Sequence, residues 1–277
     1  MPVLCEFDTR SVHPPENPFA DTQGTVHFPQ TFVARPRLPH GLRELNMSRN
    51  ANISVKSTNM YYTTEWADCH ITTWDDAALY SGIDSIFVLT PADVEFQTGE
   101  HMRTPMIDPN DPPSARVDFR EPFASPPKVV VFFNYLDLDK HHGWRIKTTA
   151  TDIDERGFTI KIETWGNTIL NAAQACWIAY PEDRKHIFST SINTLEVRPT
   201  NKKQHQHNKT ISFDGVEFWK EPDVFVALNY LDVSRRANLR INAYVDGVTS
   251  TNLNWHVDSW DDTVLHAGGA SIIAFNR

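Results

Sequence analysis

The sequence repeats itself, and this repetition limits the folds that the chain can adopt. The tetrad Asn134-Tyr-Leu-Asp137 returns 95 positions later as Asn229-Tyr-Leu-Asp232. A tryptophan occurs at the same point of each copy, as Trp74, Trp165 and Trp260, with spacings of 91 and 95 residues. The 277 residues therefore form three copies of about 92 residues each. We expect three domains, at 1–93, 94–185 and 186–277.

The copies show the pattern of β-strands. Leu253, Trp255 and Val257 alternate with polar residues, and similar alternation occurs in the other copies. A period of two is typical of a strand with one buried face. About 90 residues suffice for one small sandwich core. We expect an all-β chain of three tandem antiparallel β-sandwich domains, which lie close together because the connections between them are short.

Composition excludes several classes of function. The formal net charge is −9, and an acidic surface repels phosphate backbones, so we expect no nucleic-acid binding. No apolar run approaches the ~18 residues of a membrane span, and no signal peptide is visible at the start of the chain. Three cysteines suit a reducing compartment. We expect a cytoplasmic protein, or one exported without a signal peptide, and no membrane insertion.

Strand parity places large side chains on the face away from the core. Trp260 has the opposite parity to Trp255, and Trp165 and Trp74 occupy the same position in their copies. Arg145 and Arg240 are likewise out of phase with their apolar neighbours. An exposed Trp and Arg indicate either an interface between copies or a ligand site, and one seam could serve as both.

The tetrad that begins with each of these tryptophans also has two interpretations. Its polar residues are Asp75 and Asp76, Gly166 and Asn167, and Asp261 and Asp262. Asp, Asn and Gly favour turns. The same side chains, next to an Arg and a Trp, could instead hold a polyol, because charged groups bond to hydroxyls and an indole covers apolar C–H groups.

Catalytic and metal sites are weaker interpretations. Adjacent aspartates in one turn do not reach the ~5–9.5 Å separation of a glycosidase pair. The pairs His141-His142 and His205-Gln-His207 lack the further ligands of a metal motif. We therefore expect no enzyme activity, no cofactor and no metal.

Taken together, the motifs resemble a known family, the H-type lectin domain. In the middle copy the resemblance lies in Phe119, Phe123, Pro127, Leu136-Asp137, Trp144-Arg-Ile146, Thr164-Trp-Gly-Asn-Thr168 and Trp177-Ile-Ala179. In the last copy it lies in Phe218, Pro222, Leu231-Asp232, Asn238-Leu-Arg-Ile241, Ser259-Trp-Asp-Asp-Thr263 and Ile273-Ala274. Three tandem copies are similar to fungal members of this family.

The resemblance implies a six-stranded antiparallel sandwich that associates as trimers. We therefore expect the three copies to form a pseudo-trimer, a pseudo-threefold ring, within one chain. It also implies metal-free binding of galactose or N-acetylgalactosamine at the seams between units. The sugar-binding residues that it implies here are Arg145 and Arg240, Trp74, Trp165 and Trp260, the following residues Asp75, Gly166 and Asp261, and a carboxylate from a neighbouring unit, Asp108.

The copies are not equal. Ser54 stands where the first copy should have its Arg, and Gly166 gives the middle copy no polar side chain after its Trp. A serine cannot replace the donors of a guanidinium, so we expect at most two sugar sites per chain. The expected partners are glycans, with a homo-oligomer of the chain as a further option. The alternative is a non-catalytic module that has lost sugar binding and docks to a partner protein.

Overall fold

A computed structural model describes residues 2–276 of the chain. The strands of the first copy are β1 (Val3–Asp8), β2 (Asp21–His27), β3 (His40–Met47), β4 (Ile53–Tyr62), β5 (Trp66–Thr73) and β6 (Leu79–Val88). Those of the second are β7 (Gln97–Arg103), β8 (Ser114–Asp118), β9 (Lys128–Leu138), β10 (Trp144–Thr151), β11 (Gly157–Thr164) and β12 (Leu170–Tyr180). Those of the third are β13 (Ile187–Asn193), β14 (Asn208–Ser212), β15 (Asp223–Val233), β16 (Leu239–Asp246), β17 (Asn252–Asp258) and β18 (Leu265–Phe275). Two short 3-10 helices, η1 (Thr9–Ser11) and η2 (Thr194–Glu196), follow β1 and β13, and the predicted all-β class is confirmed.

Each copy folds as two three-stranded halves that pack face to face. In the first copy, β1, β6 and β3 form one half and β2, β5 and β4 form the other. A Cβ atom at Gly24 of β2 would lie only 2.6 Å from the ring of Phe7 in β1. The alternating strand β17 buries Leu253, Trp255 and Val257 completely. The antiparallel sandwich predicted from period-2 alternation is therefore present.

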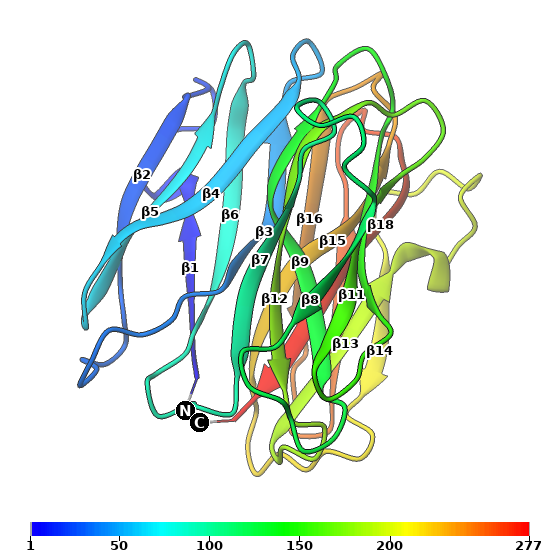
Figure 1. Cartoon of the computed structure of the whole chain (residues 1–277). Helices are drawn as coiled ribbons and strands as arrows, with labels where there is room; N and C mark the ends of the chain where they lie inside the picture. Colours follow the sequence, from blue (N-terminus) through cyan, green and yellow to red (C-terminus); the bar gives the residue numbers. More distant parts are fainter. Residues whose placement is uncertain (1, 277) are drawn as a thin grey trace.

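The three sheets are shared between copies, which sequence reasoning did not foresee. Their strand orders are β1-β6-β3-β16-β17-β14, β13-β18-β15-β10-β11-β8 and β2-β5-β4-β9-β12-β7. The copies join where β4 pairs with β9, where β10 pairs with β15 and where β16 pairs with β3. We call these junctions seam 1–2, seam 2–3 and seam 3–1. Because every copy takes part in two seams, the three copies close a ring within one chain (Figure 1).

A separate apolar cluster lies where the three copies meet. Phe87 of the first copy contacts Phe225 of the third with ring centroids 5.8 Å apart, and Phe132 of the second contacts Phe225 at 4.9 Å. Gly41, Phe132 and Ala227 hold the same position in their copies. A Cβ atom at Gly41 would lie 2.5 Å from Phe132 and 2.8 Å from Ala227. The centre of the ring thus has room for one large side chain and two small ones.

The two ends of the described part of the chain, residues 2–276, lie close together at one end of the molecule (Figure 1). Pro2 and Asn276 line the same small hollow there. Among residues 2–276, no helix has the length and apolar character needed to cross a membrane. The side chains of Cys5, Cys69 and Cys176 are all buried.

Candidate functional site

Each seam carries a row of side chains that crosses neighbouring strands. The outer strand of one copy places Ser54, Arg145 or Arg240 directly opposite Asp137, Asp232 or Asn46 of the next copy. The recurring tryptophan follows the strand on the other side, so that each row reads Trp, then Arg or Ser, then Asp or Asn. The seams therefore join the predicted Arg and Trp residues to an acceptor from a second copy.

At seam 2–3 the row contains an ion pair between a partly exposed Arg and a buried Asp. Arg145 Nε lies 3.4 Å from Asp232 Oδ1, and Arg145 Nη1 donates to Asn167 Oδ1 at 2.8 Å. Trp165 meets Tyr230 with ring centroids 5.5 Å apart. Burial raises the pKa of Asp232, an effect that the charges of His266 and Arg145 oppose. Asp232 Oδ1 accepts no hydrogen bond within residues 2–276.

At seam 3–1 the row is richer in carboxylates. Arg240 Nη1 donates to Asp262 Oδ1 at 2.6 Å, and its Nε lies 3.5 Å from Asp261 Oδ2. The guanidinium holds the pKa of the exposed Asp262 below its ordinary value. Across the seam, Asn46 Oδ1 is buried and accepts no hydrogen bond from the described part of the chain. In each Arg row, one buried oxygen across the seam, Asp232 Oδ1 or Asn46 Oδ1, accepts no hydrogen bond within residues 2–276.

At seam 1–2 the acceptor is already used by the protein. Asp137 accepts from Ser54 Oγ at 3.1 Å, from Trp74 Nε1 at 3.3 Å and from Asn171 Nδ2 at 3.0 Å. Ser54 is fully buried, and Trp74 stacks on Tyr135 at 5.0 Å. This row is closed, because it offers neither a guanidinium nor a free acceptor.

The residue after each Trp adopts the left-handed backbone conformation. Its φ is 55° at Asp75, 65° at Gly166 and 53° at Asp261. In each tetrad the fourth N–H donates to the carbonyl of the Trp, as in a tight turn. The turn interpretation is confirmed, and in two copies an aspartate occupies a conformation that suits glycine. The turn exposes Asp75 and Asp261 beside their rows, whereas Gly166 contributes no side chain.

Two segments of the chain match a known family. Residues 114–180 and 208–275 match the family model described as the H-type lectin domain. These two segments are H-type lectin domains. The matched segments contain Arg145 and Trp165 in one case and Arg240 and Trp260 in the other. The family model thus matches the two copies that supply an Arg to a seam.

Single proteins resemble the chain less closely. A protein named "ATP synthase subunits region ORF 7" from Fuscovulum blasticum is 36% identical over 72 residues, which are 25% of this chain and 63% of that protein. The chain therefore spans less than two thirds of that relative. The solved structure of discoidin II from Dictyostelium discoideum aligns over 100% of this chain and 96% of its own, with 10% identity and a TM-score of 0.28.

The rows at the seams include residues that the sequence analysis did not select. Asp232 and Asn46 face the two Arg residues, and Asp137 closes the third row. The repeated Asn-Tyr-Leu-Asp tetrad contained Asp137 and Asp232, so a signal was present. It did not show which strand of which copy would lie opposite the Arg.

Asp108 lies in the loop that follows β7. Its side chain is exposed, and Oδ1 accepts the backbone N–H of Asn110 at 3.0 Å. The loop touches seam 1–2, because Met106 N–H donates to the carbonyl of Asn171, whose side chain bonds to Asp137. A contact between Asp108 and a sugar remains a prediction, and it would concern the closed row.

Two hollows border the turn of the seam 3–1 row. One, of about 220 Å³, is lined by Lys203, Gln204 and Asp262, and the other, of about 540 Å³, by Gln206, Trp260 and Asp261. The His205 side chain, which lines both hollows, bonds to Ser259 at 3.0 Å. His207 is fully buried with its Nδ1 on the carbonyl of Val257 at 2.7 Å. Within residues 2–276, no group of three or more His, Cys, Asp or Glu side chains could hold a metal ion.

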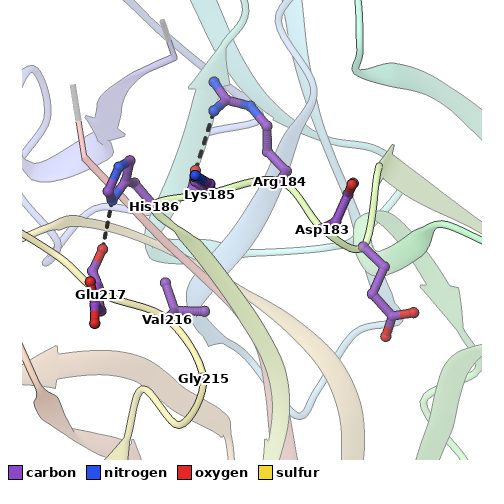
Figure 2. A pocket seen from close by; sticks show the side chains of 8 residues that line it. Asp183, Arg184, Lys185, His186, Gly215, Val216 and Glu217 are labelled. Carbon is purple, nitrogen blue, oxygen red and sulfur yellow. Dashed lines mark hydrogen bonds between the residues drawn. The ribbon is translucent and has the colours of Figure 1, made fainter.

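Another hollow, of about 600 Å³, lies at the connection between the second and third copies (Figure 2). Its lining is charged, and the His186 ring bonds to the carbonyl of Glu217 at 2.6 Å. Arg184 is paired with Glu95 at 2.9 Å. None of the predicted sugar-binding residues lines this hollow, so it is separate from the rows at the three seams.

Proposed function

We propose that the chain is a non-enzymatic lectin that binds terminal galactose or N-acetylgalactosamine at seams 2–3 and 3–1, without a metal. The observation that carries the proposal is that, at each of these seams, an Arg lies opposite a buried oxygen, Asp232 Oδ1 or Asn46 Oδ1, that accepts no hydrogen bond within the described chain. A buried acceptor without a partner costs about 1–3 kcal/mol. A sugar hydroxyl would remove that cost by donating to Asp232 or Asn46.

The other groups of each row fit the remaining surface of a sugar. A guanidinium donates charge-assisted bonds to ring hydroxyls, and the aspartates after Trp260 accept from them. An indole face covers the apolar C–H patch of a pyranose. In this proposal the three units are residues 1–93, 94–185 and 186–277, and each competent site combines groups from two units.

Calorimetric titration with free galactose tests the number of sites. We expect two or fewer sites per chain, because the closed row at seam 1–2 offers no free acceptor. Arg240→Ala should weaken the seam 3–1 site by about 1.5–3 kcal/mol, which is about 10- to 150-fold. Arg156→Ala, which removes an exposed Arg far from the rows, is the matched control and should change nothing.

Three equal sites would contradict the closed row. Binding that disappears with a chelator would contradict the metal-free site. If neither galactose nor any glycan of an array binds, the second function applies instead, and the chain is a module that docks to a partner protein. The closed row of seam 1–2 is the observation that favours this second function.

As the pH falls, galactose binding at seam 2–3 should be lost before galactose binding at seam 3–1. Burial raises the pKa of Asp232, whereas Arg240 lowers that of Asp262. As the pH falls from neutral, Asp232 therefore gains its proton first and loses its attraction for Arg145. Arg240→Ala, which keeps only seam 2–3, should therefore lose galactose at a higher pH than Arg145→Ala, which keeps only seam 3–1. Titrations of both variants from neutral pH down to about pH 3 measure the order of the two midpoints, and equal midpoints would contradict it.

A further inference from the structure

Seam 1–2 has a second polar feature beyond its closed row. The pairing of β4 with β9 ends at Lys56 and Tyr135, and beyond that point β4 leaves the seam. A hollow of about 350 Å³ opens there between the first and second copies. Its polar lining comes from both copies and includes Lys56, Asn59, Tyr62, Glu100, Asn134 and Gln174. The volume is at the lower end of the range of small-molecule sites, about 300–1,000 Å³.

Two amides that line this hollow each have one atom without a hydrogen-bond partner in the described chain. Asn134 is only 1% exposed, and its Nδ2 donates to Glu100 Oε1 at 3.1 Å. Its Oδ1 is buried and accepts nothing from residues 2–276. Asn59 Nδ2 is likewise buried without an acceptor in the described chain. An unpartnered acceptor and an unpartnered donor on two residues that line the same hollow indicate a ligand that supplies both kinds of group.

The residues equivalent to Asn134 in the other two copies have hydrogen-bond partners. In the third copy, Asn229 Nδ2 donates to Ser191 at 2.8 Å and to Ser271 at 2.9 Å. At seam 3–1, Arg43 donates to Asn242 Oδ1 at 2.9 Å and bonds to Glu6. Neither Asn229 nor Arg43, the residues that correspond to Asn134, has a buried side-chain nitrogen or oxygen without a partner within residues 2–276. The unpartnered amide oxygen at the position of Asn134 is therefore specific to the second copy and is not a property of the repeat.

The charges around the hollow balance. Lys56 brings an ammonium and Glu100 a carboxylate. His40, which is 6% exposed, lies behind them with its Nδ1 at 3.0 Å from the buried carboxylate of Asp84. A lining of balanced charge with free amide groups suits a neutral ligand rich in hydroxyls better than an ion.

We propose that this hollow binds a neutral polyhydroxylated molecule of monosaccharide size, at a site separate from the Arg rows. Hydroxyl oxygens would accept from Lys56 Nζ and Asn59 Nδ2, and a hydroxyl would donate to Asn134 Oδ1. The ring of Tyr62 offers an apolar surface for C–H groups. The site requires neither Arg145 nor Arg240. It can therefore be tested independently of the proposed function.

The test uses the full chain carrying Arg145→Ala and Arg240→Ala, which removes the rows. Glucose, galactose, mannose and N-acetylglucosamine are titrated one at a time, up to about 20 mM, while amide NMR shifts are followed. At least one probe should shift the amides of residues 56–60, 100 and 174, with one site per chain. Lys56→Met and Asn59→Leu, each added to this background, should weaken that probe at least about tenfold.

Lys147→Met is the matched control, because Lys147 holds the position of Lys56 in the second copy. It should leave the binding unchanged. The amide spectrum itself reports whether each variant is folded, and Lys56→Met changes a side chain outside the core. The proposal is overturned if no probe shifts these amides, or if binding is unaffected in both Lys56→Met and Asn59→Leu.

Discussion

Gly41→Leu is expected to lower the free energy of unfolding by about 3 kcal/mol or more, because it overfills the centre of the ring. A Cβ atom at this position already lies 2.5 Å from Phe132 and 2.8 Å from Ala227. Both neighbours belong to other copies, so the clash pushes the copies apart rather than straining one sandwich. Chemical denaturation measures the loss, and small-angle scattering measures whether the ring opens.

A second substitution separates overfilling from other effects of Gly41→Leu. Phe132→Ala removes the large ring that meets Gly41, and on its own it should cost about 3–5 kcal/mol by leaving a cavity. In the double variant the leucine fills the space left by Phe132. The loss of unfolding free energy should therefore be smaller than the sum of the losses of the two single variants. Full additivity, or a Gly41→Leu chain as stable as the parent, would refute the packing described for the ring centre.

Loss of either Arg is expected to abolish tight retention on a galactose-coated surface. Two sites on one chain convert the second binding event into an intramolecular one, which is worth about 10²- to 10⁴-fold in avidity. The two rows occupy equivalent positions on the ring, so both can face one dense surface. Arg145→Ala should therefore dissociate far faster from a densely coated surface, although its remaining site still binds free galactose.

Surface density provides the control for this avidity. On a sparsely coated surface the parent chain and Arg145→Ala should dissociate at similar rates, because each chain then uses one site. Arg156→Ala should behave like the parent at both densities. If Arg145→Ala remains firmly bound to the dense surface, a single site suffices and the bivalent arrangement is wrong.

The sequence differences between the three copies can exist only when the copies are joined in one chain, and not in a trimer of identical subunits. The centre of the ring combines Gly41, Phe132 and Ala227, and a Cβ at Gly41 alone already meets both neighbours closely. The seams differ in the same way, since Ser54 replaces Arg in the first copy. A single chain can fix which copy is the large one at the axis and which seam is closed, whereas identical subunits cannot.

The sequence by itself determined the repeat, the strands and the outward position of the Trp and Arg residues. Period-2 alternation is a local property, so the buried set Leu253, Trp255 and Val257 could be predicted residue by residue. The same alternation placed Arg240 and Trp260 on the opposite face. The turns after each Trp were also predictable, because their Asp and Gly residues favour that geometry locally.

Only the tertiary structure decided what those residues face. Asp232 and Asn46 come from other copies, and the register of β10 on β15 and of β16 on β3 brings them opposite Arg145 and Arg240. No local pattern encodes such a register, since it depends on how complete sandwiches pack around the ring centre. The closed row of seam 1–2 arises in the same way, because Ser54, Trp74 and Asn171 meet at Asp137 only after the ring has formed.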